Sequence, residues 1–202
     1  MAPDIVYLHG FRSSPASEKA RQLAFWASES GYSGQVHIPQ LGFEPEPVVA
    51  QIRTLIETLL AQGREVALIG SSLGGFLAAL MAERYGLRAA LINPAPRPYD
   101  LFREMTGEHE NLYTGERFVV TTDHLESLRA MDGPLSVPER LLVLLQTGDE
   151  TLDYRQALAR YQGAHCHVQE GGDHSYVGFE QKLPAIMAFL SGGDWENAPG
   201  PC

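Results

Sequence analysis

The sequence predicts an α/β protein with three layers, in which a six-stranded parallel sheet is covered by helices on both faces. Short runs of Val, Ile, Leu and Ala alternate with longer stretches of helical periodicity, as in repeated β-α-β units. These runs are almost wholly apolar, which is typical of strands buried on both faces. A chain of 202 residues is long enough for one domain and too short for two ordinary ones. We therefore expect a single domain over residues 1–190 and a flexible tail over residues 191–202.

The N-terminal part of the chain contains two predicted strands and two predicted helices. The run Ile-Val-Tyr-Leu-His gives a strand at residues 5–9, and apolar residues at i, i+3, i+4 and i+7 give a helix over about residues 17–30. The second strand, residues 36–38, is closed by Pro39, which cannot donate to a sheet ladder. Val, Ile and Leu then share one face of a helix over about residues 47–60, which stops before Gly63.

The rest of the chain continues the alternation after a strand at residues 66–69. A Gly/Ser turn leads into a helix at residues 73–85, and a fourth strand at residues 89–92 stops before Pro94. Strands follow at residues 141–145 and 166–169, and helices at about residues 154–161 and 179–190. Residues 94–140 are too many for a bare connection, so we expect a cap-like insertion of short helices over one end of the sheet.

Composition and charge exclude several classes of function. The 25 acidic residues outnumber the 15 Lys and Arg, and the net charge of -10 disfavours nucleic acid as a partner. Two cysteines, Cys166 and Cys202, neither build a disulfide scaffold nor have metal-ligand spacing. The N-terminus lacks the features of a signal peptide, and no apolar run reaches the ~20 residues of a membrane helix. We expect a cytoplasmic protein without a membrane span, metal or other cofactor.

The junction between the third strand and the following helix carries the strongest chemical signal. Residues 70–74 read G-S-S-L-G and match G-x-S-x-G around Ser72, the nucleophile elbow of many hydrolases. The two glycines are needed because side chains there would collide as the turn projects the serine hydroxyl upward. The alternative is a glycine-rich turn in which Ser71 and Ser72 cap the helix. The strand-to-helix context favours a nucleophile.

A nucleophilic serine needs a base and an acid that orients the base. His174 follows the sixth strand and Asp149 follows the fifth, so both lie at the sheet edge where Ser72 is expected. We therefore predict Ser72 as nucleophile, His174 as base and Asp149 as acid. Asp153 is the alternative acid, although it also reads as the N-cap of the next helix.

The loop after the first strand is the expected place for an oxyanion hole. Such a hole needs two N–H donors, one from the residue after the nucleophile, Leu73, and one from this loop, Phe11. Because Gly10 has no side chain, it would allow the backbone of this loop to approach the nucleophile closely. Taken alone, the segment also fits an ordinary strand-to-helix loop with His9 packed beneath it.

These motifs together resemble a known group, the YqiA-type esterases of the α/β-hydrolase superfamily. The resemblance spans about residues 5–190 and rests on motifs of different specificity. The motifs are Y-L-H-G-F (7–11), G-S-S-L-G-G (70–75), N-P-A (93–95), N-L-Y-T-G (111–115), T-G-D-E (147–150) with D-Y-R-Q (153–156), and E-G-G-D-H (170–174). The resemblance implies a compact α/β-hydrolase fold with strand order 2-1-3-4-5-6, and activity on acyl esters or thioesters. By motif position it also implies the roles of Ser72, Asp149 and His174.

The expected reaction is ester hydrolysis through an acyl-serine intermediate, with a small-molecule acyl ester or thioester as substrate. Arg12, Tyr113 and Phe118 are candidates for contacting it, the last two from the insertion. The alternative for these aromatic residues is packing in the core beneath the insertion, which fits the sequence at least as well. A rival reading is an acyl-CoA thioesterase, whose nucleotide phosphates would need a positive rim such as Arg12 and Arg97. A rival of another class is a binding protein that keeps the hydrolase scaffold without catalysis.

Overall fold

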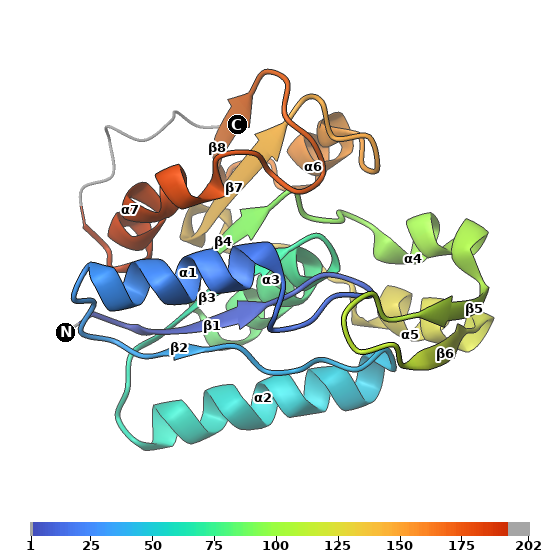
Figure 1. Cartoon of the computed structure of the whole chain (residues 1–202), viewed down its shortest axis with the longest axis horizontal. Helices are drawn as coiled ribbons and strands as arrows, with labels where there is room; N and C mark the ends of the chain where they lie inside the picture. Colours follow the sequence, from blue (N-terminus) through green and yellow to red (C-terminus); the bar gives the residue numbers. More distant parts are fainter. Residues whose placement is uncertain (1, 194–202) are drawn as a thin grey trace.

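The computed structural model describes residues 2–193 and is built around a six-stranded, wholly parallel sheet (Figure 1). Its strands are β1 (Asp4–Leu8), β2 (Val36–His37), β3 (Val66–Ser71), β4 (Arg88–Ile92), β7 (Leu141–Gln146) and β8 (His165–Gln169). The order across the sheet is β2-β1-β3-β4-β7-β8. These labels differ from the predicted 2-1-3-4-5-6 because two further strands lie in the insertion. Numbered among themselves, the six strands follow the predicted order.

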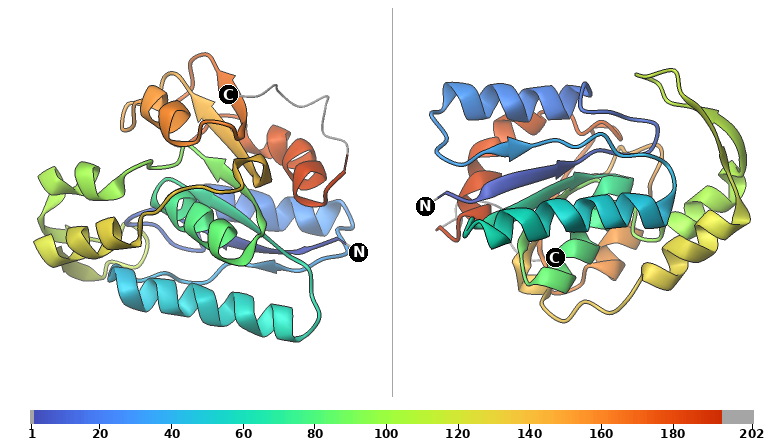
Figure 2. Two further views of the ribbon diagram at one scale, coloured as in Figure 1. Left: turned by 180° about the vertical axis from the view of Figure 1, so that it is seen from behind. Right: turned by 90° about the horizontal axis from the view of Figure 1, so that it is seen from below.

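Helices cover both faces of the sheet and divide its core into two halves. They are α1 (Glu18–Glu29), α2 (Pro45–Ala61), α3 (Leu73–Tyr85), α6 (Tyr154–Arg160) and α7 (Phe179–Leu190). In β1, Ile5 and Tyr7 pack with α1 and α7, whereas Val6 and Leu8 pack with the cluster that includes α2, α3 and α6. Figures 1 and 2 show α1 on one side of the sheet and α2 on the other. The predicted three-layer α/β class is confirmed.

The insertion lies beyond the carboxyl end of β1 (Figures 1 and 2) and contains more than the expected short helices. Its elements are α4 (Pro98–Leu101), η1 (Phe102–Met105), β5 (Gly107–Glu110), β6 (Arg117–Val120), α5 (Thr122–Met131) and η2 (Pro138–Arg140). β5 and β6 form an antiparallel hairpin, so the expectation of helices alone was wrong. Alternating burial explains it, since Phe118 and Val120 point inward and Arg117 and Val119 outward.

The boundaries of β3 also differ from the prediction. The strand continues through Gly70 and Ser71, because Gly70 pairs with β1 and β4 and Ser71 pairs with Ile92 of β4. The turn is therefore confined to Ser72 itself. Within residues 2–193, no helix combines the length and apolarity needed to cross a bilayer. Most of the predicted tail, from residue 194 onward, lies outside the described residues.

Candidate active site

Ser72 occupies a strained turn between β3 and α3. Its φ of 56° and ψ of −120° lie in a region that L-residues rarely adopt. Hydrogen bonds hold this conformation: the Ser72 N–H donates to the Ile92 carbonyl at 3.1 Å, and the Ala95 N–H donates to the Ser72 carbonyl at 3.0 Å. The segment after β4 thus fixes the turn. The strain is concentrated at the residue predicted to be the nucleophile.

The glycines on either side of Ser72 are required by close backbone contacts. A Cβ on Gly70 would lie 2.1 Å from the Gly74 carbonyl oxygen, and a Cβ on Gly74 would lie 2.0 Å from the Leu8 carbonyl oxygen. Real Cβ atoms do not approach other atoms so closely, so any larger side chain would push α3 away from β1. The predicted steric reason for the two glycines is confirmed.

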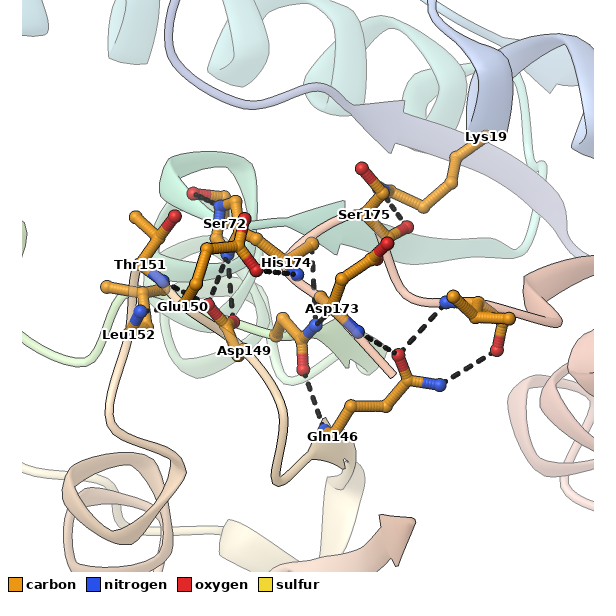
Figure 3. A network of polar contacts seen from close by, with 12 residues as sticks. Lys19, Ser72, Gln146, Asp149, Glu150, Thr151, Leu152, Asp173, His174 and Ser175 are labelled. Atoms are coloured by element: carbon orange, nitrogen blue, oxygen red, sulfur yellow. Dashed lines mark hydrogen bonds and ion pairs between the residues drawn. The ribbon is translucent and has the colours of Figure 1, made fainter. Parts of the chain in front are cut away.

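Ser72, His174 and Asp149 form a continuous chain of hydrogen bonds (Figure 3). Ser72 Oγ lies 3.1 Å from His174 Nε2, and His174 Nδ1 lies 2.8 Å from Asp149 Oδ2 and 3.0 Å from Asp149 Oδ1. A carboxylate only accepts hydrogen bonds, so Nδ1 carries the proton and Nε2 is free to accept from the serine hydroxyl. The three residues come from the ends of three strands, as expected from the sequence.

Asp149 is buried and held by the backbone that follows it. Its side chain is only 2% exposed, and its Oδ1 accepts the N–H groups of Thr151 and Leu152, each at 2.8 Å. The alternative acid, Asp153, accepts the Arg155 N–H at 3.0 Å as N-cap of α6, and its side chain is 44% exposed. Of the two carboxylates, only Asp149 is bonded to His174 within residues 2–193.

The loop that carries His174 is fixed by three polar residues that sequence reasoning gave no role. The amide of Asn93, at the end of β4, donates to the Asp173 carbonyl at 2.9 Å. The carboxylate of Glu150 accepts the His174 N–H at 3.0 Å. Gln146, at the end of β7, is fully buried, and its Oε1 accepts the Asp173 N–H at 3.0 Å.

Gln146 and Asn93 join the loop to the sheet from both sides. Gln146 Nε2 donates to the Val177 carbonyl at 2.8 Å, and its Oε1 also accepts the Val177 N–H at 2.9 Å. Asn93 Oδ1 accepts the Gln146 N–H at 3.0 Å. A polar Gln at the end of an otherwise apolar strand is the one sequence signal that could have drawn attention to Gln146, and it was not used. The network sets the position of the His174 backbone relative to β4 and β7.

The loop after β1 approaches Ser72 directly. A Cβ on Gly10 would lie 3.3 Å from Ser72 Cβ and 3.8 Å from Ser72 Oγ, so the backbone before Phe11 borders the nucleophile. His9 fixes this loop: its ring is buried, Nδ1 lies 3.0 Å from the Gly10 carbonyl, and Nε2 accepts the Leu41 N–H at 3.1 Å. Burial lowers the pKa of His9, which keeps the ring neutral and Nε2 able to accept.

The same loop is tied to the hairpin of the insertion. Arg12, with a φ of 58°, accepts the Leu112 N–H at its carbonyl at 3.1 Å and donates from Nε to the Glu110 carbonyl at 2.9 Å. Asn111 donates from its amide to the Ser13 carbonyl at 2.9 Å. Asn111 Oδ1 also accepts the N–H groups of residues 113 and 114 at 2.9 and 3.1 Å, which shapes the hairpin turn. The N-L-Y-T-G motif therefore supports the loop that borders Ser72.

Two spaces meet at this loop. One, here called the open cleft, has a volume of about 780 Å³ and is lined by Ser72, His174, Arg12 and Tyr113 among others. The second, here called the apolar cavity, measures about 40 Å³ and lies between α2 and the insertion. Its lining includes Phe11, Phe43, Leu73, Phe118, Val120 and Leu128.

The residues proposed to contact substrate are divided between the two spaces. Phe118 is buried and stacks on Phe43 with ring centroids 4.6 Å apart, so it lines the apolar cavity. Tyr113 is half-exposed in the open cleft, and Arg12 borders both spaces. Arg97 is exposed at the N-terminus of α4. Among residues 2–193, no group of three or more His, Cys, Asp or Glu side chains is arranged to hold a metal ion.

Comparison with known proteins assigns the family. A model of an uncharacterised protein family, UPF0227, matches residues 4–191. The chain belongs to this family. UPF0227 is the YqiA-like esterase family that the motifs resemble, and the match runs from β1 through α7.

Solved structures place this UPF0227 member in the α/β-hydrolase fold. Est1E from Butyrivibrio proteoclasticus with bound ferulic acid has a TM-score of 0.69 at 15% identity, covering 93% of this chain and 88% of that one. A putative hydrolase from Agrobacterium vitis S4 has a TM-score of 0.65 at 21% identity, covering 94% and 88%. A monoacylglycerol lipase from Paleococcus ferrophilus has a TM-score of 0.65 at 14% identity, covering 93% of each chain. At these identities the likeness establishes the fold alone.

Proposed function

We propose that this protein is a serine hydrolase of carboxylic esters, with Ser72 as nucleophile, His174 as general base and Asp149 as the acid that orients it. The observation that carries the proposal is the hydrogen-bond chain from Ser72 Oγ through the His174 ring to Asp149, built on a strained strand-to-helix turn. The names of similar structures, among them an esterase from Pyrococcus furiosus and a monoacylglycerol lipase, agree with ester chemistry.

The proposed reaction has two halves that use the same base. His174 Nε2 takes the Ser72 proton as Oγ attacks the ester carbonyl, then gives that proton to the alcohol oxygen as the carbon–oxygen bond breaks. This leaves an acyl-serine and a free alcohol. Water then attacks the acyl carbon, His174 takes its proton, and the proton returns to Ser72 as the carboxylic acid leaves. Asp149 keeps the His174 proton on Nδ1 throughout.

The N–H groups of Leu73 and Phe11 are proposed to stabilise the oxyanion. Leu73 begins α3, so its N–H lies at the positive end of the helix, and Phe11 follows the glycine that borders Ser72. Losing one such donor typically lowers kcat on the order of 10²-fold. Both residues also line the apolar cavity, which makes that cavity the natural site for the acyl group.

The two substrate halves are proposed to lie on opposite sides of the loop after β1. Because His174 must reach the leaving oxygen, the alcohol belongs in the open cleft, which His174 lines. The acyl group then points to the apolar cavity beyond Phe11, where Phe118 would contact it. Tyr113 would border the alcohol, and Arg12 the passage between the two spaces.

The proposal is tested by hydrolysis of p-nitrophenyl esters by the wild-type protein and by Ser72→Ala. We expect turnover by the wild type and a loss of at least about 10⁴-fold in kcat for the variant. Wild-type protein that hydrolyses neither p-nitrophenyl esters nor acyl-CoA would favour a scaffold used only for binding. Turnover of acyl-CoA in clear preference to esters would instead support the thioesterase reading.

A further inference from the structure

Unpaired buried polar atoms belong mostly to residues that line the open cleft. Among residues 2–193, five buried side-chain polar atoms lack a hydrogen-bond partner, and four of them belong to residues that line this cleft. The four are Ser17 Oγ, Gln22 Oε1, Asp173 Oδ1 and Tyr176 Oη. An unpaired buried polar group is costly and rare in folded proteins, so such a concentration beside a nucleophile points to a ligand that completes the bonding.

Tyr176 is the clearest member of this group. Its side chain is 2% exposed, and it adopts a φ of 64°, which is an outlier for a bulky aromatic residue. Its N–H donates to the Asp173 carbonyl at 3.1 Å, which closes a turn around His174. Burial raises the pKa of Tyr176, so the hydroxyl remains protonated and can both donate and accept.

The other members supply acceptors. Gln22 Oε1 and Asp173 Oδ1 accept hydrogen bonds only, so together with the Tyr176 hydroxyl they suit a ligand that donates. Ser17 is the N-cap of α1, yet its hydroxyl does not cap the helix. The Tyr7 hydroxyl interacts with the Ser17 side chain, so we leave Ser17 aside and base the inference on Tyr176, Asp173 and Gln22, here called the polar recess.

The charges around the polar recess favour a neutral ligand. Asp173, Glu18 and Glu180 line the cleft together with Lys19 and Arg12, so acidic and basic groups nearly balance. Lys19 Nζ already donates to the Ser175 carbonyl at 2.8 Å (Figure 3), and the Arg12 Nε donates to the hairpin. A phosphate would therefore meet carboxylates and few uncommitted cations. Hydroxyl groups fit the unpaired acceptors better.

We propose that the polar recess binds hydroxyl groups on the alcohol part of the substrate, so that the enzyme hydrolyses acyl esters of polyols. This inference rests on the proposed function, because it assigns the cleft on the His174 side to the leaving alcohol. A cleft that hydrogen-bonds substrate hydroxyls rejects an analogue that lacks them, since its buried polar groups then stay unpaired. Tyr176, Asp173 and Gln22 would thus determine specificity.

The test compares two esters that differ only in the alcohol hydroxyls: 1-butyrylglycerol and propyl butyrate. The kcat/KM of each ester is measured in a pH-stat. The ratio of the two values is then divided by the ratio of the alkaline hydrolysis rates of the two esters, which corrects for their difference in intrinsic reactivity. We expect a corrected preference of at least about tenfold for the glycerol ester. Tyr176→Phe should lower this preference by about three- to tenfold. The matched control, Tyr85→Phe, removes a hydroxyl that donates to Glu57 at 2.6 Å and should retain the preference.

Stability gives a second readout for Tyr176→Phe. Because the Tyr176 hydroxyl has no hydrogen-bond partner among residues 2–193, its removal should leave Tm unchanged or raise it, and a clear fall in Tm would contradict the inference. A corrected ratio near one that Tyr176→Phe does not change would also overturn the inference about the polar recess. In that case, hydrolysis of both esters would still support the proposed function. Hydrolysis of neither ester, with no labelling of Ser72 by a fluorophosphonate, would overturn both.

Discussion

Replacing Asp149 by Asn should preserve the fold and reverse the tautomer of His174. Asp149 Oδ1 accepts two backbone N–H groups at 2.8 Å, and Oδ2 faces His174 Nδ1 at 2.8 Å. The single carbonyl oxygen of Asn would take the position of Oδ1, where it can accept the N–H groups of Thr151 and Leu152. Its NH₂ group would then face Nδ1 and could only donate to it.

The cost of this reversal can be worked out from the hydrogen bonds. Nδ1 must lose its proton to accept from the amide, so the proton moves to Nε2, which lies 3.1 Å from Ser72 Oγ. A protonated Nε2 cannot take the serine proton. In a Ser-His-Asp hydrolase such a change lowers kcat by about 10⁴-fold, or about 5 kcal/mol of transition-state stabilisation. Unfolding free energy should change by only about 1 kcal/mol, because the backbone hydrogen bonds remain.

The assay is the kcat for a p-nitrophenyl ester, with Asp153→Asn as the matched control. Asn and Asp cap helices about equally well, so the control should retain kcat within about twofold and keep its Tm. Asp149→Asn should melt cooperatively near the wild-type temperature but turn over about 10⁴-fold more slowly. An Asp149→Asn protein with kcat within about tenfold of wild type would refute the assignment. A large loss confined to Asp153→Asn would transfer the role of acid to Asp153.

Three further predictions test the surroundings of Ser72. Gly10→Ala places a methyl group 3.8 Å from Ser72 Oγ, so kcat should fall by at least about tenfold with little change in Tm. An unchanged kcat would show that this loop does not contact the reacting groups. Burial lowers the pKa of His9, so the folded protein binds fewer protons there than the unfolded chain. This stability contribution is complete above about pH 6.5 and is lost as the pH falls through the lower folded value, so Tm should drop with acidification and His9→Gln should reduce that slope. The apolar cavity is small, with a volume of about 40 Å³, which predicts a chain-length optimum among short acyl groups. Leu128→Ala should lengthen that optimum while lowering stability by about 2–5 kcal/mol, as measured with a p-nitrophenyl ester series and urea unfolding.

The elements that position the candidate site could be predicted because they depend on local signals. The helix bounds at residues 73–85 and 179–190 match the structure, since flanking Gly marks the ends of both helices, with small apolar residues filling the first and apolar periodicity marking the second. The places of Ser72, Asp149 and His174 followed from one topological rule, that parallel strands end at a common edge. The hairpin of the insertion was missed because β5 reads Gly-Glu-His-Glu and carries almost no apolar signal.

The supporting network could not be read from the sequence because its contacts are long-range. Asn93 reaches Asp173 across 80 positions and Gln146 reaches it across 27, and no local pattern encodes such pairings. The division into an apolar cavity and an open cleft depends on hydrogen bonds from Arg12 to the hairpin, about 98 positions away. Phe118 was predicted to contact substrate, but its burial against Phe43 appears only in three dimensions.

The most direct test of Ser72 as nucleophile is covalent labelling with a fluorophosphonate, mapped by peptide mass spectrometry. We expect one adduct per chain, on Ser72, that forms more slowly in the presence of an ester substrate. Ser71→Ala, which removes the buried neighbouring hydroxyl, should still be labelled, and Ser72→Ala should not. Absence of any adduct on the wild-type protein, or an adduct on a serine other than Ser72, would contradict the role of Ser72 as nucleophile.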